Sequence, residues 1–136
     1  AAVRGMIDRG RLAVAAAALG TARAAFETSR DYAKQRETFG QPIATRQAIA
    51  FMLADMAIEI DGARLLIWEA ASAIDRGVPA SRLTRLAHDQ IRRIGQQVAD
   101  GAVQVFGGHG YIRDYLPELH LRNLAGLGSF ETLALV

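Results

Sequence analysis

The stretch IAFMLADMAIEIDGARLLIWEAASAI, residues 49–74, decides the fold class because its apolar residues recur with the period of an α-helix. Steps of three or four residues separate the members of one apolar seam, which are Ile49, Met52, Met56, Ile60, Ala63, Ile67, Ala70 and Ile74. Such a seam lies along one side of a helix and packs against antiparallel neighbours. Leu53 and Leu66 widen it, so we expect this helix to be covered on more than one side. Gly77 and Pro79 then predict its end and the start of the next element.

Two further long helices are predicted, one before and one after this stretch. The first extends from about Val3 to Gln35, with alanine-rich residues 13–18 at its centre, and alanine is the best helix former. Its apolar face continues in Leu19, Ala22 and Phe26. The later helix extends from about Pro79 to Phe106 and ends at a glycine-rich stretch. Its inward residues are expected to be Leu83, Leu86, Ile94, Val98 and Val105.

These elements predict an all-α fold, an up-and-down antiparallel bundle of three long helices. One or two short C-terminal helices should follow, near residues 114–122 and 130–136. The chain is expected to reverse near residues 36–43, 76–79 and 107–111, and no β-sheet is expected. Residues 1–136 are interpreted as a single helical domain, a C-terminal fragment of a longer chain, because there is no initial Met and the last residues are apolar.

Composition excludes several classes of protein. Hydrophobic residues make up 51% of the 136 residues, which excludes a disordered chain. The net charge is +2 and the arginines are scattered, so no nucleic-acid partner is indicated. The absence of cysteine excludes disulfides, and the spacing of the three histidines predicts no metal site. No apolar run reaches the roughly 20 residues of a membrane span, so a cytoplasmic protein is expected.

Two motifs in a fixed order point to a family. Residues 36–43 read RETFGQPI and are followed by Gln47, and residues 102–111 read AVQVFGGHGY. Together they resemble the signatures of the C-terminal domain of the acyl-CoA dehydrogenase family, and the resemblance extends from Asp8 to about Glu131. It implies a helical bundle that assembles into a homodimer or homotetramer and forms part of the flavin and acyl-CoA sites. The N-terminal helical and middle β domains of that family are absent from this chain.

The resemblance implies FAD as the cofactor and assigns contacts to it. The residues implied to reach an FAD bound mainly to a neighbouring subunit are Arg36, Thr38, Phe39, Gln47, Gln104, Gly107 and Gly108. A guanidinium pairs with two phosphate oxygens at once, and glycines let backbone N–H groups approach an anion, so the residue types fit. His109, inside the glycine turn, is also expected near the cofactor. The alternatives are that the glycines only end a helix and that Phe39 is a core residue.

A further match lies in the first helix and concerns the substrate. Asp8 and Arg11 occupy positions where the family uses an acidic residue and an arginine near the acyl-CoA, and Phe130 is implied to line the substrate site. Arg11 precedes Arg36 by 25 residues, as the family pattern requires. The alternative for Asp8 and Arg11 is a surface ion pair at i, i+3, worth roughly a few tenths of a kcal/mol.

Glu131 is the catalytic base that the resemblance implies. It follows Arg122 by nine residues, which is the family spacing. A glutamate with an ordinary pKa of about 4.3 is a weak base toward the α-proton of a thioester, and an apolar lining would raise that pKa. The family has Gly-Thr where this chain has Thr132 and Leu133, and aspartate where it has Asn123. The alternative is that Glu131 is a surface or capping residue.

The implied activity is the α,β-dehydrogenation of an acyl-CoA thioester to a trans-2-enoyl-CoA, within fatty acid metabolism. An electron acceptor such as an electron-transfer flavoprotein is the implied partner, and the isolated domain is expected to be inactive. Three alternatives stay open: a related flavin oxidase of the nitroalkane type, a non-catalytic subunit of a mixed oligomer, and a helical interaction domain without flavin. The altered segment after Glu131 favours the non-catalytic subunit among them.

Overall fold

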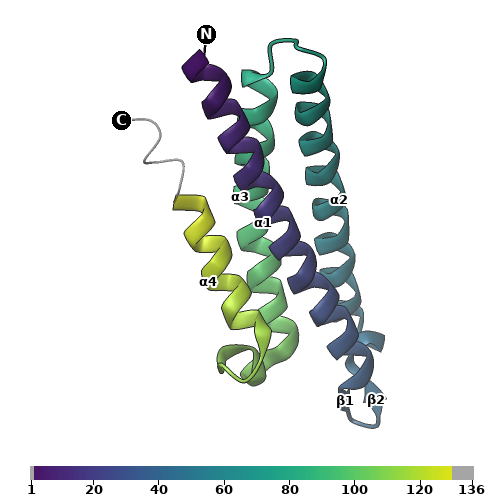
Figure 1. Ribbon diagram of the computed structural model, residues 1–136. Helices are drawn as coiled ribbons and strands as arrows, with labels where there is room; N and C mark the ends of the chain where they lie inside the picture. The colour runs from purple at the N-terminus through teal and green to yellow at the C-terminus, as the bar shows by residue number, and fades with distance from the viewer. Residues whose placement is uncertain (1, 130–136) are drawn as a thin grey trace.

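The computed structural model describes residues 2–129, along which four helices alternate in direction (Figure 1). They are α1 (Ala2–Gln35), α2 (Gln47–Asp75), α3 (Ser81–Phe106) and α4 (Leu116–Ser129). The predicted all-α bundle of three long helices and a shorter one is therefore confirmed. The helix expected near residues 130–136 lies outside the described residues. Within residues 2–129, no helix is long and apolar enough to cross a membrane.

The bundle is built around a face of small side chains on α1. The buried residues of this face are Ala15, Ala18, Ala22, Ala25, Ser29 and Ala33. Because these side chains are short, the backbone of α1 approaches α3, the helix that it contacts most extensively. Larger side chains fill the rest of the core, with Met56, Ile60 and Ile67 from α2 and Ile91, Ile94 and Val98 from α3.

The apolar seam of α2 is buried in its middle and half-buried at its ends. Met56, Ile60, Ala63, Ile67 and Ala70 are buried, whereas Ile49, Met52 and Ile74 are half-buried. One inward assignment on α3 is wrong, because Leu86 is 45% exposed. Its neighbours Ala87 and His88 are buried. Successive residues are about 100° apart around a helix, and this turns Leu86 away from the core.

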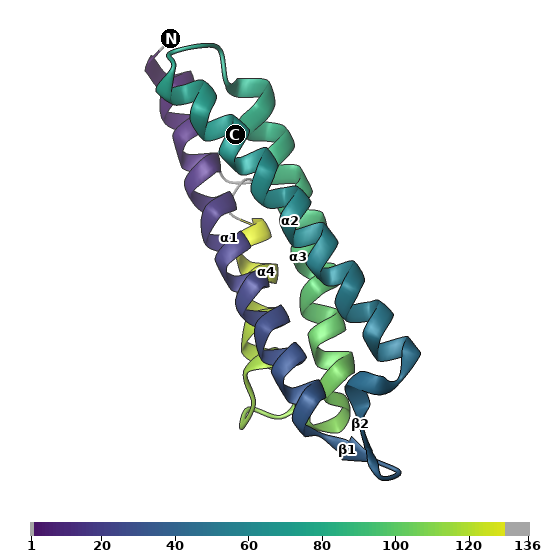
Figure 2. The ribbon, with the colours of Figure 1, turned by 90° about the vertical axis from the view of Figure 1, so that its right-hand side faces the viewer.

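The helix α4 is longer than the sequence predicted and covers α1 and α3 on the side away from α2 (Figures 1 and 2). Prediction ended it at Arg122, but its buried Leu124 packs in the core beyond that residue. Gly95 of α3 makes room for this contact, since a Cβ at Gly95 would lie 3.2 Å from Cδ2 of Leu124. Tertiary packing thus extends a helix that its glycines would shorten.

The first reversal of the chain is a short hairpin, so the expectation of no β-structure is wrong at this turn. Strand β1 (Glu37–Thr38) pairs antiparallel with β2 (Gln41–Pro42), and Thr38 lies opposite Gln41. The two residues between the strands, Phe39 and Gly40, have positive φ angles of 52° and 77°. Two successive positive φ angles are the mark of a type I′ turn, which matches the twist of a two-residue hairpin. A short 3-10 turn, η1 (Ile43–Thr45), then leads into α2.

Candidate functional site

Two segments that are distant in the sequence meet at the end of the bundle where the hairpin lies. They enclose a cavity of about 870 Å³, the hairpin cavity, which is lined by Tyr32, Arg36, Thr38, Phe39, Ile43, Arg46, Ile49, Gln104, Val105, Phe106, Gly107, Gly108 and His109. We call residues 36–46 the hairpin arm and residues 104–109 the glycine arm. Of the residues implied to contact FAD, the structure brings six together in this cavity. Gln47 is the exception, because it is exposed on the first turn of α2 and does not line the cavity.

The charged groups of the hairpin cavity are two arginines, Arg36 and Arg46. Among the described residues, no carboxylate lines the cavity with them. Arg46 Nη2 donates a hydrogen bond of 3.1 Å to the carbonyl oxygen of Thr38, which ties the start of α2 to the hairpin. Its guanidinium also lies 5.7 Å from the centre of the Phe39 ring. The cavity is therefore cationic, which suits an anionic ligand.

Sequence reasoning missed Arg46, although a signal was present. The residue follows the proline-containing end of the hairpin by four positions, and the hairpin folds it back toward Arg36. Because residues 36–43 were predicted to reverse the chain, the next cationic residue, Arg46, could have been assigned to the same site as Arg36. Tyr32 was missed for a different reason, because an aromatic residue on a helix is most often a core residue.

Phe39 is an exposed and strained residue. Its side chain is 97% exposed, so the alternative that it belongs to the core is wrong. It is also the one residue other than glycine with a positive φ in the described part of the chain. Such backbone strain in a non-glycine residue costs of order 1–3 kcal/mol and is concentrated at functional sites. An exposed aromatic ring at the mouth of a cavity is available to stack on a planar ligand.

The glycine-rich stretch of residues 107–110 contains two glycines that the fold requires, Gly107 and Gly110, and one that it does not. Gly107 ends α3 with φ at 58°, a conformation that L side chains rarely adopt. A Cβ on Gly110 would lie 2.6 Å from the carbonyl oxygen of Val103 and 2.9 Å from its Cα. The alternative that glycines only end the helix therefore describes Gly110, whereas Gly107 ends the helix and also lines the hairpin cavity. This alternative does not describe Gly108. A Cβ at Gly108 would meet no other atom within 4 Å, and the residue lines the hairpin cavity.

Asp8 and Arg11 form a buried cluster near the start of α1. Asp8 Oδ1 lies 3.8 Å from Arg11 Nη1, and their side chains are both 9% exposed, so the alternative of a surface ion pair is wrong. Asp8 also accepts hydrogen bonds from the hydroxyl groups of Ser81, at 2.6 Å, and Thr84, at 3.1 Å. A buried carboxylate needs such partners. The implied contact with acyl-CoA stays a prediction, and Phe130 and Glu131 lie outside the described residues.

The two clusters lie at opposite ends of the bundle. Arg11 is near the first turns of α1, whereas Arg36 follows its last residue, and 25 residues at 1.5 Å each span roughly 38 Å. Figure 1 shows the start of α1 at the top and the hairpin at the bottom. A single small ligand cannot contact both clusters of one chain.

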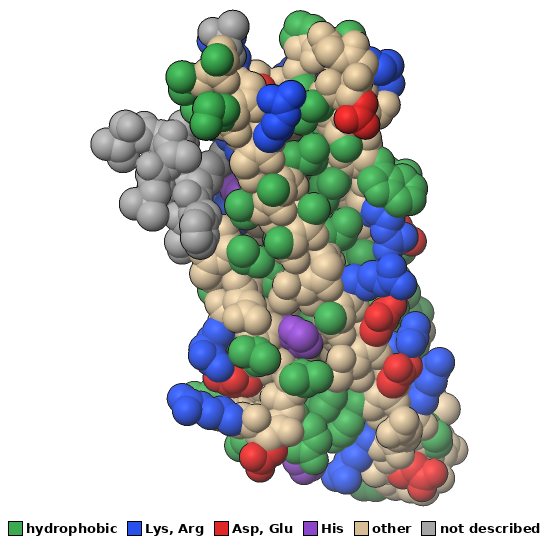
Figure 3. All heavy atoms as spheres, viewed as in Figure 1, with side chains coloured by type: hydrophobic (Ala, Val, Ile, Leu, Met, Phe, Trp, Pro, Cys, Tyr) green, Lys and Arg blue, Asp and Glu red, His purple; other side chains and the backbone are tan. Residues whose placement is uncertain are grey.

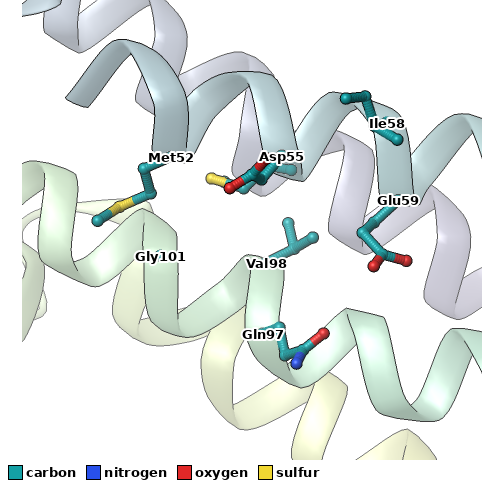
Figure 4. A pocket seen from close by; sticks show the side chains of 8 residues that line it. Met52, Asp55, Ile58, Glu59, Gln97, Val98 and Gly101 are labelled. Atoms are coloured by element: carbon teal, nitrogen blue, oxygen red, sulfur yellow. The ribbon is translucent and has the colours of Figure 1, made fainter. Parts of the chain in front are cut away.

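A second hollow lies between α2 and α3 and has a different character. Figure 4 shows Met52, Asp55 and Glu59 of α2 facing Gln97, Val98 and Gly101 of α3, while Ile58 points away. The carboxylate of Glu59 already accepts hydrogen bonds from Gln90, at 3.2 Å, and Arg93, at 3.1 Å. No group of three metal-binding side chains occurs among residues that the structure describes. We therefore assign no chemistry to this groove.

Replacing single glycines within residues 107–110 should separate folding from binding. We expect Gly110→Ala to lower the free energy of unfolding by about 1–3 kcal/mol, because its methyl group would overlap the backbone of Val103. Gly108→Ala is the matched control and should stay within about 0.5 kcal/mol of the wild type. Urea unfolding followed by circular dichroism measures both values, and equal losses in the two variants would contradict the distinction between these glycines.

Comparison with known proteins identifies the family. The sequence profile of the acyl-CoA dehydrogenase C-terminal domain matches residues 1–130. The chain is 45% identical over 117 residues to an acyl-CoA dehydrogenase of Bacillus subtilis (strain 168), which covers 86% of this chain and 31% of that protein. Over the same length and coverage it is 41% identical to subunit CarC of the caffeyl-CoA reductase-Etf complex of Acetobacterium woodii.

The fold agrees with a solved structure of the same family. Butyryl-CoA dehydrogenase from Megasphaera elsdenii matches with a TM-score of 0.90 at 38% identity, over 92% of this chain and 33% of that chain. The chain thus spans about a third of the length of these relatives. Because the profile covers nearly all of the sequence and the helices agree, the chain belongs to the acyl-CoA dehydrogenase family and corresponds to its C-terminal domain.

Proposed function

We propose that this domain is part of an FAD-dependent acyl-CoA dehydrogenase that converts an acyl-CoA thioester to a trans-2-enoyl-CoA. The observation that carries the proposal is the hairpin cavity, in which Arg36, Arg46 and the open backbone at Gly108 surround one hollow. Guanidinium groups and backbone N–H groups are the donors that bind phosphate oxygens. The exposed ring of Phe39 adds a stacking surface for a planar group. A dinucleotide carries both a pyrophosphate and planar ring systems, so it matches the donors and the stacking surface of the cavity.

The chemistry divides between the cofactor and this chain. When bound, FAD supplies the acceptor for the hydride that leaves the β-carbon of the substrate. Glu131 takes the α-proton on its carboxylate, and the electrons of that C–H bond form the new double bond. The support for Glu131 is its spacing in the sequence. Asp8 orients Arg11 toward the CoA part of the substrate through their buried contact.

The separation of the two clusters supports an assignment to two different active sites. The hairpin cavity of one chain holds the FAD of a neighbouring subunit, while Asp8 and Arg11 serve the acyl-CoA of their own subunit. A span of roughly 38 Å along α1 is compatible with this division. Each active site is then incomplete without a second copy of the chain.

The outer face of α2 is the surface that we propose for assembly into a homodimer or homotetramer. Phe51, Ile58, Leu65 and Trp68 lie on it and are 60%, 69%, 62% and 62% exposed. The first three recur every seven residues, so they form one stripe along the helix. Figure 3 shows hydrophobic side chains interspersed with charged ones along the edge formed by α2. An apolar stripe of this length is typical of an interface between subunits.

The relative that is a subunit of an Etf complex supports an electron-transfer flavoprotein as the electron acceptor. A cytoplasmic location and a role in fatty acid metabolism belong to the same proposal. The second candidate function is a non-catalytic subunit of a mixed oligomer, which supplies cofactor contacts while another chain supplies the base. It is favoured by Thr132 and Leu133, which replace the family's Gly-Thr after Glu131.

The cofactor assignment predicts that Arg36→Ala and Gln104→Ala each weaken FAD binding in the full-length protein. Loss of a charged hydrogen-bond donor at Arg36 should weaken affinity by about 10- to 100-fold. Arg92→Ala removes an exposed arginine from the middle of α3 and is the matched control. Flavin absorbance after extensive dialysis measures occupancy. Full occupancy in both cavity variants would show that these residues are structural only.

The base assignment predicts that Glu131→Gln slows flavin reduction by an acyl-CoA by about 10²- to 10⁴-fold, because the amide cannot accept the proton. The substitution conserves volume, so FAD content and acyl-CoA binding should be retained. Anaerobic stopped-flow mixing, followed at the flavin absorption band, measures the rate. A wild-type rate would instead support the non-catalytic subunit and would leave the family membership unaffected.

The assembly surface predicts that Ile58→Glu weakens the oligomer at least tenfold, because a charge would be buried at the centre of the stripe. Leu116→Glu introduces the same side chain at an exposed position of α4, on the other side of the bundle, and is the control. Light scattering over a dilution series measures the mass of each variant. Retention of the wild-type mass by Ile58→Glu at all concentrations would refute the surface.

A further inference from the structure

A direct hydrogen-bonded contact joins the end of α1 to the glycine arm of the hairpin cavity. The hydroxyl oxygen of Tyr32 lies 3.2 Å from Nδ1 of His109, and the two residues are 77 positions apart in the sequence. Tyr32 belongs to the last turns of α1, while His109 follows Gly107 and Gly108 directly in the 3-10 turn η2 (Gly107–Tyr111). Both side chains line the cavity.

Tyr32 is connected to the hairpin arm by its backbone as well. The backbone N–H of Arg36 donates a hydrogen bond of 2.8 Å to the carbonyl oxygen of Tyr32, and the N–H of Ile43 donates one of 2.8 Å to the carbonyl oxygen of Arg36. The side chain of Tyr32 therefore reaches the glycine arm, while its carbonyl group holds the first residue of the hairpin arm.

Aromatic packing keeps both rings in place. The ring of Tyr32 stacks on that of Phe106, with centroids 3.8 Å apart and planes at 15°. The ring of Tyr115 packs edge-on against His109 at 5.1 Å and against Phe106 at 5.7 Å. Buried Phe106 anchors the group to α3. Side chains that are packed in this way lose rotamer freedom before any ligand arrives, so the geometry of the cavity is preorganised.

We infer that Tyr32 and His109 are a positioning pair that sets the distance between Arg36 and the open backbone of Gly107 and Gly108. The ligand whose affinity they tune is a pyrophosphate-bearing dinucleotide, so the inference rests on the proposed function. Neither residue needs to touch the ligand for this role. When the imidazole is neutral and the tyrosine hydroxyl donates, the ring proton of His109 is on Nε2.

The test compares variants of the full-length protein by their dissociation constants for FAD. Tyr32→Phe removes the hydroxyl but keeps the ring stacked on Phe106, and His109→Phe keeps a ring beside Tyr115 but removes Nδ1. Each should weaken FAD binding by about 2- to 10-fold, the range of one hydrogen bond. The double variant should bind FAD no more weakly than the single variant with the lower affinity, because both substitutions remove the same contact. Tyr111→Phe is the matched control, since Tyr111 is 83% exposed beside the same turn, and it should bind FAD as the wild type does.

Two further measurements separate positioning from folding. Hydrogen exchange in the apoprotein should be faster at the amides of residues 107–110 in Tyr32→Phe, while the thermal midpoint stays that of the wild type. Unchanged FAD affinity in Tyr32→Phe would overturn the inference. A loss of FAD affinity that is fully explained by a smaller fraction of folded protein would also overturn it.

Comparison with Arg36→Ala separates the inference from the proposed function. If Arg36→Ala weakens FAD binding and Tyr32→Phe does not, the positioning pair is wrong and the proposed function stands. If neither variant weakens binding, the hairpin cavity does not hold the FAD, and the positioning pair fails together with the assignment of the cofactor to that cavity.

Discussion

The close approach of α1 and α3 is the constraint on which the rest of the structure depends. Alanines such as Ala22 and Ala25, which are fully buried, have only a methyl side chain, so the two helices can approach closely. Because α1 and α3 run parallel to one another and in extensive contact, the last turns of α1 lie beside those of α3. As a result, Tyr32 stacks on Phe106 and the hairpin lies next to the glycine arm. The cavity is thus a consequence of where two helices end.

Long periodic patterns made most of the bundle predictable from the sequence. The seam of residues 49–74 indicated α2 within two residues at its start and one at its end, because burial and helical period agree there. The hairpin could not be predicted in the same way. Its turn places Phe39, a bulky residue, in the left-handed region, against local preference. The extension of α4 was also missed, since it depends on Leu124 meeting Gly95 of another helix.

The candidate site was predictable where it is carried by motifs and not where it is carried by tertiary contacts. The motif residues Arg36, Gln104 and Gly108 come together as the resemblance implied. Arg46 and the contact between Tyr32 and His109 depend on how the chain folds back, which no local pattern records. The same holds for Ser81 and Thr84, whose hydroxyl groups satisfy Asp8 across two helices.

In the proposed oligomer, the placement of the two clusters at opposite ends of α1 would have a genetic consequence. Consider a dimer in which each hairpin contacts the FAD of the neighbouring subunit. A substitution at Arg36 then inactivates the active site of the partner, whereas a substitution at Arg11 inactivates the active site of its own chain. When these two defective chains assemble together, both lesions fall on one active site and the other receives only intact parts. Two alleles that are each inactive as homo-oligomers would therefore complement one another, and a heterozygote would retain activity that neither homozygote has.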